Sequence, residues 1–274
     1  MALLTLNVSG ATPLTFRGAE GPGRATVPGV SYREAPPPSP LRGEVECAWT
    51  SEVSAAQVRD VLPDGCMDLV WTSTGLLVAG PDTAPHAARL DPGVPSAGLR
   101  FAPGRLPALL GVPAAAVRDQ RVPLAELRPA LARRATARLE HGADPVAVLA
   151  GITAALPGHP AEAGLRAVVA RLDAGGSVAD TADRLGWTAR SLHRRCLTAF
   201  GYGPAVLRRV LRFRRAAGLL YADVPIAEVA AVAGYADQPH LSREVRAFAG
   251  VAPSQLASGA KRSTPLPSGS FTTA

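Results

Sequence analysis

The chain has 274 residues, which is long enough for two domains that each bury a hydrophobic core. With 47% hydrophobic residues, 19% charged residues and a net charge of +7, it has the composition of a folded, basic globular protein. No apolar run reaches the ~18 residues needed to cross a bilayer, and the three cysteines contain no CxxC pair. We therefore predict a cytoplasmic protein without a membrane span or a disulfide framework.

The first half of the chain has the pattern of a small β unit followed by helices. Apolar residues alternate along four short segments, which predicts strands at residues 45–49, 67–71, 76–79 and 99–101. From Leu106 onward, leucines and valines recur at intervals of three, four or seven residues, which predicts helices. We assign residues 31–157 to this N-terminal domain and expect the Gly- and Pro-rich residues 1–30 to be frayed or disordered.

The second half has the pattern of helices alone, and it follows a Pro-Gly-His-Pro break at residues 157–160. The periodicity and the capping residues predict helices at about 161–172, 177–185, 188–200, 204–221, 226–233 and 237–249. We assign residues 161–257 to an all-α domain and residues 258–274 to a disordered tail. The predicted fold class is α+β, with a small β-rich N-terminal domain, its trailing helices and an all-α C-terminal domain.

The basic charge is confined to the second half. Residues 1–160 hold 14 arginines and 14 acidic residues, so the whole net charge of +7 falls on residues 161–274. All the basic residues except Lys261 are arginines, whose planar guanidinium suits bidentate contact with phosphates and guanine edges. A solvated basic face has the same composition, so the charge alone does not decide the function.

The second half also repeats itself. Six residues recur with an offset of 49, so that Leu192, Arg194, Cys196, Gly201, Pro204 and Leu207 correspond to Leu241, Arg243, Val245, Gly250, Pro253 and Leu256. Ala182 and Gly186 recur with an offset of 48 as Ala230 and Gly234, so one residue is inserted in the second repeat. Stacked helical scaffolds have similar spacings, but they generally need three or more repeats, and here there are two.

Each repeat has the features of a helix-turn-helix unit. The alanine is small enough for a close crossing of two helices, and the glycine four residues later can adopt the positive φ of a sharp turn. Thr188 and Asp237 can then cap the second helix. The outward side of that helix carries groove-reading residue types, which are Arg190, His193, Arg194 and Arg195 in the first unit and Gln238, His240, Ser242, Arg243 and Arg246 in the second.

An arginine-rich helix at residues 204–221 connects the two units. It can hold both second helices on one face of DNA, about one helical turn or ~34 Å apart. Arg212 and Arg215 on this helix have no comparable approach to a groove. We expect them to contact phosphates, or acidic side chains such as Asp223 and Glu228.

Residues 161–257, and most specifically the run GYADQPHLSR at residues 234–243, resemble the DNA-binding domain of AraC/XylS-type transcriptional regulators. The resemblance implies seven helices, two of which are recognition helices. It also carries base contacts over to five residues, Arg190, Arg194, Gln238, His240 and Arg243. Together with Arg195 and Ser242 from the outward side, these form the predicted DNA-binding set.

Three positions depart from the pattern of that family. Cys196 and Val245 stand where the family usually has Phe, and Pro239 lies in the first turn of the second recognition helix. Proline is tolerated in a first turn. Because its second helix carries Arg190 and Arg195, we expect the first unit to be the tighter binder.

Three segments of the first half, residues 61–69, 80–83 and 99–104, resemble an uncharacterised domain found ahead of such DNA-binding domains. In the wider family the N-terminal domain senses a small molecule or forms a dimer. We expect double-stranded DNA as the main partner, with RNA polymerase, a small-molecule effector and a second copy of the chain as further candidates, and no cofactor. Because a sensor needs a concave, apolar pocket, we predict a cavity among the strands, with Trp49 and Trp71 in or near it.

The sequence also allows a second class of function, in which the basic half only delivers the first half to DNA. The first half would then be an enzyme, such as a repair protein with Cys66 as nucleophile between Asp64 and Asp68. That chemistry needs a thiol with a depressed pKa. The sequence has no metal-ligand spacing, GxSxG, HExxH or phosphate loop, so we predict a regulator rather than an enzyme, without a metal site.

Overall fold

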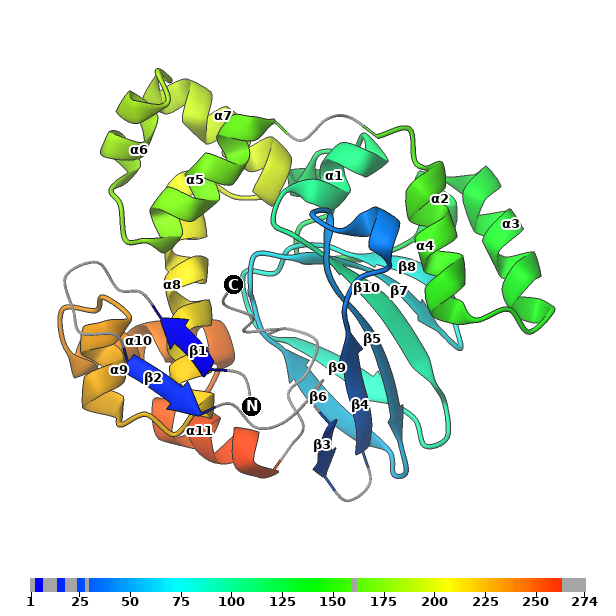
Figure 1. The fold of residues 1–274 in the computed structure, drawn as a ribbon, viewed down its shortest axis with the longest axis horizontal. Helices are drawn as coiled ribbons and strands as arrows, with labels where there is room; N and C mark the ends of the chain where they lie inside the picture. Colours follow the sequence, from blue (N-terminus) through cyan, green and yellow to red (C-terminus); the bar gives the residue numbers. More distant parts are fainter. Residues whose placement is uncertain (1–2, 7–13, 18–23, 28–29, 159–161, 263–274) are drawn as a thin grey trace.

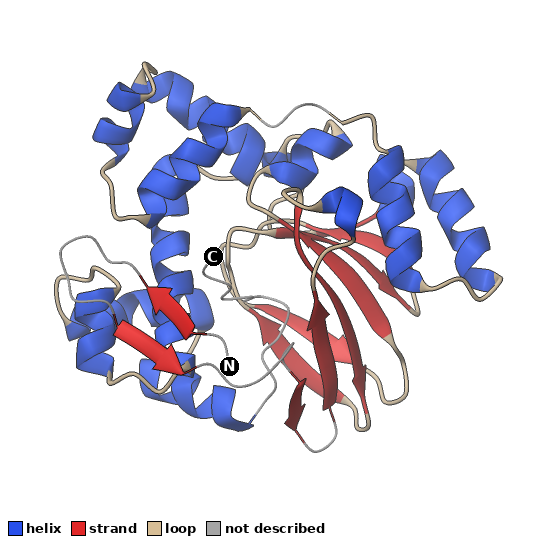
Figure 2. Ribbon diagram, in the orientation of Figure 1, coloured by secondary structure: helices blue, strands red, loops and turns tan. Residues whose placement is uncertain are grey.

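The computed structural model describes residues 3–6, 14–17, 24–27, 30–158 and 162–262. Figure 1 shows a β-rich half beside an all-helical half that is built along the long helix α8 (Pro204–Tyr221). Figure 2 shows the large sheet in the first half and helices throughout the second. The α+β class predicted from the sequence is therefore confirmed.

A seven-stranded antiparallel sheet forms the body of the N-terminal half. Its strands lie in the order β11, β8, β7, β10, β5, β4, β3. Their bounds in that order are Arg121–Pro123, Gly75–Ala79, Met67–Thr72, Ser96–Phe101, Val45–Val53, Val30–Ala35 and Arg24–Val27. The four segments with alternating apolar residues are β5, β7, β8 and β10, which are neighbours at the centre of the sheet.

The two-residue period of the strands divides the sheet into two faces. Leu69, Val78 and Leu99 lie on one face and are fully buried, in a core that also contains Leu149. The helices that contribute to this core are α1 (Arg105–Leu110), α2 (Leu124–Leu127), α3 (Pro129–Glu140) and α4 (Pro145–Ala155), with the 3-10 turn η2 (Ala114–Ala116). These are the trailing helices that the spacing after residue 106 predicted.

The opposite face of the sheet is met by a pair of strands instead of helices. β6 (Gln57–Val61) pairs antiparallel with β9 (His86–Leu90), and Leu90 packs against a small core on this face that contains Trp49 and Val70. The indole ring of Trp49 lies directly against Gly98 of β10, where any Cβ would overlap it. Glycine at this position therefore lets the ring approach the sheet.

The described part of residues 1–30 forms strands, whereas the composition predicted a frayed chain. These strands are β1 (Leu3–Leu6), β2 (Leu14–Arg17) and β3 (Arg24–Val27). β1 pairs with β2, and β3 extends the edge of the large sheet beside β4. Each strand contains apolar or β-branched residues, a local preference that the average composition of the stretch conceals. The other residues of 1–30 lie outside the described residues.

In the part of the chain that the structure describes, seven helices follow residue 161, as the resemblance implied. They are α5 (Ala163–Asp173), α6 (Val178–Arg184), α7 (Ala189–Phe200), α8 (Pro204–Tyr221), α9 (Ile226–Val232), α10 (Gln238–Ala249) and α11 (Pro253–Arg262). α11 extends past residue 257, where we expected the domain to end, and its buried Leu256 anchors it in the core. Residues 263–274 of the expected tail lie outside the described residues.

The turns of the two helix-turn-helix units, α6–α7 and α9–α10, have the backbone geometry that the repeat predicted. Gly186 and Gly234 have φ angles of 65° and 78°, in the left-handed region that residues with a side chain rarely adopt. Thr188 caps α7 and Asp237 caps α10, each by accepting a hydrogen bond from a backbone N–H in the first turn, over 3.1 Å and 2.6 Å. The predicted turns and caps are therefore confirmed in both units.

The same hydrogen bond closes each turn. In the first unit the backbone N–H of Trp187 donates to the carbonyl of Ala182 over 2.9 Å, and in the second that of Tyr235 donates to the carbonyl of Ala230 over 2.9 Å. The single inserted residue of the second unit comes after this bond. The insertion therefore leaves the first part of the turn unchanged.

The two halves of the molecule pack directly against each other. Leu62 of the N-terminal half is buried in one core with Val210 and Leu211 of α8. A Cβ at Gly201, the residue that ends α7, would lie 2.7 Å from Cγ of Pro81. The N-terminal half thus contacts both the linking helix and the end of α7.

Replacing Ala230 with leucine should destabilise the protein, because Ala230 is only 4% exposed and packs in the core of the second unit. Extra methylene groups in a filled core cost about 1–3 kcal/mol, so the thermal midpoint of the full chain should fall. Ala231→Leu is the matched control, because Ala231 is the next residue of α9 and is exposed. An unchanged midpoint for Ala230→Leu would show that the close helix crossing does not exist.

Candidate nucleic-acid interface

The second helix of each unit has a buried side and an exposed side. Leu192 and Cys196 of α7 are fully buried, as are Leu241 and Val245 at the equivalent positions of α10. The buried side is therefore the one that the repeat predicted. The exposed members of the predicted DNA-binding set on these helices are Arg190, Arg194, Gln238 and Arg243.

Three arginines on the exposed side keep their guanidinium groups free. Among the residues that the structure describes, the side chains of Arg190, Arg194 and Arg243 have no hydrogen bond or ion pair. An arginine without an internal partner can offer all five of its N–H donors to a phosphate or a base edge. Arg194 and Arg243 also occupy equivalent positions in the two units.

Arg195, in contrast, is engaged inside the first unit. Its guanidinium forms an ion pair with Glu162 and lies 4.5 Å from the centre of the Trp187 ring. Its Nε also donates to the hydroxyl of Ser191 over 3.3 Å. The side chain of Arg195 is half-buried, so its contact with DNA stays a prediction. The three arginines without internal partners among the described residues are better placed to contact DNA.

His240 is likewise held within the second unit. Its Nδ1 accepts from the backbone N–H of Ala236 over 3.3 Å, and its Nε2 lies 3.5 Å from the carboxylate of Glu244. Its ring meets the ring of Tyr235 edge-on, with 5.1 Å between the centres. His240 therefore fixes the lengthened second turn to the start of α10. The base contact of His240, and the DNA contact of the half-buried Ser242, stay predictions.

Glu244 on α10 is a buried carboxylate that the sequence pattern did not single out. Its side chain is 4% exposed, and Nη2 of Arg212 on α8 donates to it over 2.5 Å. The guanidinium of Arg212 also lies over the Tyr235 ring, 4.6 Å from its centre. Arg212 thus contacts an acidic side chain, as expected, but the partner is Glu244 and not Asp223 or Glu228.

Arg215 on α8 connects the end of α5 to the turn of the second unit. Its Nη1 donates to the carbonyl of Asp173 at the end of α5 and lies 3.4 Å from the carboxylate of that residue. Its Nη2 donates to the carbonyl of Ala233, in the turn of the second unit, over 3.2 Å. Arg215 therefore contacts an acidic side chain, as expected, but the partner is Asp173 and not Asp223 or Glu228. It also connects two helix ends inside the protein.

A cavity of about 380 Å³ lies between the large sheet and the β6–β9 pair. Trp49 lines this cavity, as predicted. The expectation is wrong for Trp71, which packs on the face that the helices cover. Asp68, Val70 and Thr72 of β7 face the cavity, so the odd-numbered Trp71 on the same strand points the other way.

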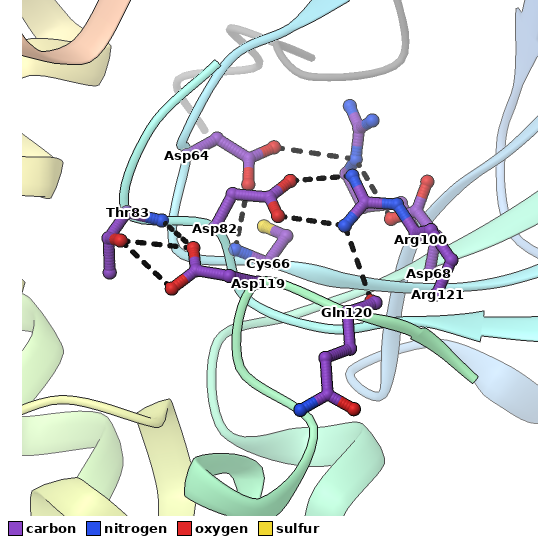
Figure 3. A network of polar contacts seen from close by, with 9 residues as sticks. All are labelled: Asp64, Cys66, Asp68, Asp82, Thr83, Arg100, Asp119, Gln120 and Arg121. Carbon is purple, nitrogen blue, oxygen red and sulfur yellow. Dashed lines mark hydrogen bonds and ion pairs between the residues drawn. The ribbon is translucent and has the colours of Figure 1, made fainter. Parts of the chain in front are cut away.

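Cys66 lines the same cavity, within the polar network drawn in Figure 3. Burial raises the pKa of its thiol well above the usual value, and the carboxylates of Asp64 and Glu46 raise it further. A nucleophilic cysteine needs the opposite shift, because the thiolate is the reactive form. The environment of Cys66 therefore weighs against the alternative of a reactive-cysteine enzyme.

The described residues contain no group of three or more His, Cys, Asp or Glu side chains that could hold a metal ion. Within the same residues, no helix has both the length and the apolar character of a membrane span. Cys47, Cys66 and Cys196 are all buried and free of disulfides.

Two family models match the chain, one in each half. Residues 181–259 match a helix-turn-helix domain, and residues 33–123 match a domain of unknown function, DUF6597. The first match begins in α6 and ends in α11, so it includes both helix-turn-helix units. Among curated proteins, none matches the chain.

Solved structures of ToxT from Vibrio cholerae are distantly similar to this chain. An apo ToxT variant from strain SCE256 has a TM-score of 0.44 and 10% identity, over 77% of this chain and 96% of that one. A P21 crystal form of ToxT has a TM-score of 0.42 and 10% identity, over 84% and 98%. ToxT bound to an unsaturated fatty acid has a TM-score of 0.39 and 11% identity, over 74% and 94%. Similarity at this level carries no argument about function.

Removing the carboxylate of Glu244 should destabilise the protein, because the charge of Arg212 would lose its partner at a site where Glu244 is 4% exposed. Breaking a buried pair on one side costs about 3–5 kcal/mol, which denaturant unfolding of Glu244→Ala can measure. Glu228→Ala is the control, because Glu228 is an exposed residue of α9. Equal stabilities for the two variants would contradict a structural role for the pair.

Proposed function

We propose that this chain, a DNA-binding regulator of the AraC type, recognises two successive major-groove segments with α7 and α10 as its recognition helices. The observation that carries the proposal is the pair Arg194 and Arg243. These residues occupy equivalent positions on two helices of the same local geometry, both are exposed, and both keep their donors free of internal partners. A guanidinium in that state can form two parallel hydrogen bonds with a guanine edge.

Reading with two helices requires that they are held at a fixed separation, close to one helical turn of DNA or ~34 Å. We propose that α8 provides this constraint. Arg212 is bonded to Glu244 of α10, and Arg215 is bonded to both α5 and the turn before α10. These contacts support a rigid connection between the two units.

The seven residues of the proposed DNA-binding set differ in how free their side chains are. We propose base contacts for the exposed residues Arg190, Arg194, Gln238 and Arg243. Arg195, His240 and Ser242 are half-buried, and the first two have internal partners. For Arg195 and Ser242 we propose contacts to the DNA backbone, which position the helices without reading sequence, and for His240 the base contact that the resemblance implies.

The N-terminal half is proposed to modulate DNA binding, because it contacts the end of α7 and the middle of α8. The carbonyl of Gly201 at the end of α7 accepts a hydrogen bond from Nη1 of Arg118 over 3.1 Å. A small-molecule effector, RNA polymerase and a second copy of the chain are the further partners that we propose for the regulator.

Arg194→Ala tests base reading by the first unit. It should weaken binding to the preferred site by about 1–3 kcal/mol and relax the preference at one base position. The measurement is the Kd of the full chain for that site and for its single-base variants over a salt series. Arg184→Ala is the control, because Arg184 is an exposed arginine of α6 that pairs with Asp180. An equal loss for every sequence, with a shallower salt dependence, would identify Arg194 as a phosphate contact instead.

Arg215→Ala should weaken binding to all sequences by a similar factor, because it removes a bridge between α5 and the second unit and not a base contact. The thermal midpoint should fall as well, since the carbonyl of Ala233 and the terminal carbonyl of α5 would lose a donor. A loss of affinity limited to one base position, at an unchanged thermal midpoint, would contradict the bridging role.

A further inference from the structure

The cavity of the N-terminal half has the size and the lining of a small-molecule site. Its volume of about 380 Å³ falls in the ~300–1,000 Å³ range of ligand pockets. Apolar walls come from both the sheet and the β6–β9 pair, and they include Trp49, Val70, Leu77 and Leu90. Arg89 and Asp91, which are exposed and carry opposite charges, stand at its opening.

The polar floor of this cavity contains two carboxylates that share one guanidinium (Figure 3). Nε of Arg100 lies 3.6 Å from Asp64 and 3.4 Å from Asp68. The neighbouring pair has different geometry, because Arg121 forms two hydrogen bonds of 2.7 Å with the two carboxylate oxygens of Asp82. Asp82 therefore has a close ionic partner of its own, whereas Asp64 and Asp68 share one guanidinium at a longer distance and each accept one uncharged N–H, from the backbone of Cys66 over 2.8 Å and from Trp49 over 2.9 Å.

The side chains of the two acids are more exposed than that of the arginine they share. The side chain of Arg100 is 2% exposed, against 12% for Asp64 and 13% for Asp68. Nη1 of Arg100 is buried without a hydrogen-bond partner, so the guanidinium is not fully used by the two acids. Arg121 also lines the cavity, but both of its terminal nitrogens donate to Asp82.

The floor also has an excess of negative charge. Asp64 and Asp68 are two acids against one Arg100, while the adjoining Glu46 and Arg214 lie 4.0 Å apart and offset each other. Burial raises the pKa of Asp68 to about 6 and raises the pKa of Asp64, because the charged forms are incompletely compensated. A positive charge in the cavity would restore the balance.

Trp49 supplies an aromatic surface next to these acids. Its Nε1 donates to a carboxylate oxygen of Asp68 over 2.9 Å, which fixes the ring beside the floor. The ring lines the cavity and is backed by Gly98. An aromatic face and a carboxylate in one site are the two groups that bind organic cations in proteins.

We propose that this cavity binds an organic cation, namely an amine or amidine attached to a small apolar or aromatic body. The nitrogen donates to Asp64 and Asp68, and the apolar body packs between Trp49 and the side chains of Val70 and Leu90.

The walls of the cavity also contact the DNA-binding half. Leu62, Asp64 and Cys66 line the cavity, and Leu62 is buried with residues of α8. Gly80 and Asp82 line it from the segment whose Pro81 meets the end of α7. A cation bound in the cavity would therefore lie beside residues that pack against α8 and against the end of α7. Its role as an effector depends on the proposed function, whereas its binding does not.

Three probes of similar shape and different charge test the site. Phenethylamine carries a cation, 2-phenylethanol is neutral, and 3-phenylpropionate carries an anion. Titration calorimetry on the full chain without DNA should rank their affinities in that order, with about a tenfold or greater advantage of the amine over the alcohol. Tighter binding of the anion, or no binding of the amine at millimolar concentration, would overturn the proposal.

Asp68→Asn keeps the shape of the floor and removes a charge. The amine should lose about tenfold in affinity in this variant, while 2-phenylethanol should keep its own, which shows that the cavity is still folded. Asp60→Asn on the exposed side of β6 is the matched control and should leave both unchanged. An amine that binds Asp68→Asn as tightly as the native chain would refute the site.

The effector role has its own readout, which is the DNA affinity of the full chain with and without phenethylamine. The amine should change the affinity of the native chain and not that of Asp68→Asn. Binding of the amine with no change in DNA affinity would refute the effector role. A chain that binds the amine and no DNA would refute the proposed function and leave the site standing.

Discussion

The arrangement of the helices around α8 depends on one arginine of α8 that donates hydrogen bonds at two helix ends. The last carbonyls of a helix have no partner within it, and Arg215 donates to the carbonyl of Asp173 at the end of α5 and to that of Ala233 after α9. A guanidinium can bridge two such groups because its five donors lie in one rigid plane, whereas a lysine offers one compact charge. With the pair of Arg212 and Glu244, this bridge connects α5 and the second unit to α8.

The arginines of the C-terminal half therefore fall into two groups, those that pair within the protein and those that do not. A count of arginines does not distinguish them. Arg212 and Arg215 are paired with groups of the protein itself, and these pairs stabilise the arrangement of the helices. Arg190, Arg194 and Arg243 have no such partners among the described residues and remain available to an anion. Partners within the fold, more than net charge, distinguish the structural arginines from the candidate DNA contacts.

The features that were predictable from the sequence are those that depend on residues a few positions apart. The turn glycines, the caps Thr188 and Asp237, and the alternation in the central strands are local, and each was found where expected. The partner of Arg212 was not predictable, because Glu244 lies 32 residues away on another helix and meets it only through the fold. The available signal was the position of Glu244 three residues after Leu241 and next to Val245, on the buried side of α10. For Trp71, the strand period alone already assigns it to the other face of β7 from Asp68.

The contact between the two halves reaches the ends of both α7 and α10 through one segment. Pro81 lies against Gly201 and Pro85 against Gly250, and these glycines end α7 and α10 in the left-handed conformation. Because a helix end without a side chain lets another backbone approach closely, the segment at residues 81–85 can touch both ends at once. A shift of this segment would therefore move the two helix ends together relative to α8, or displace one against the other. Because the proposed two-site reading tolerates little change in the separation of α7 and α10, this segment is the place where the proposed modulation by the N-terminal half would act.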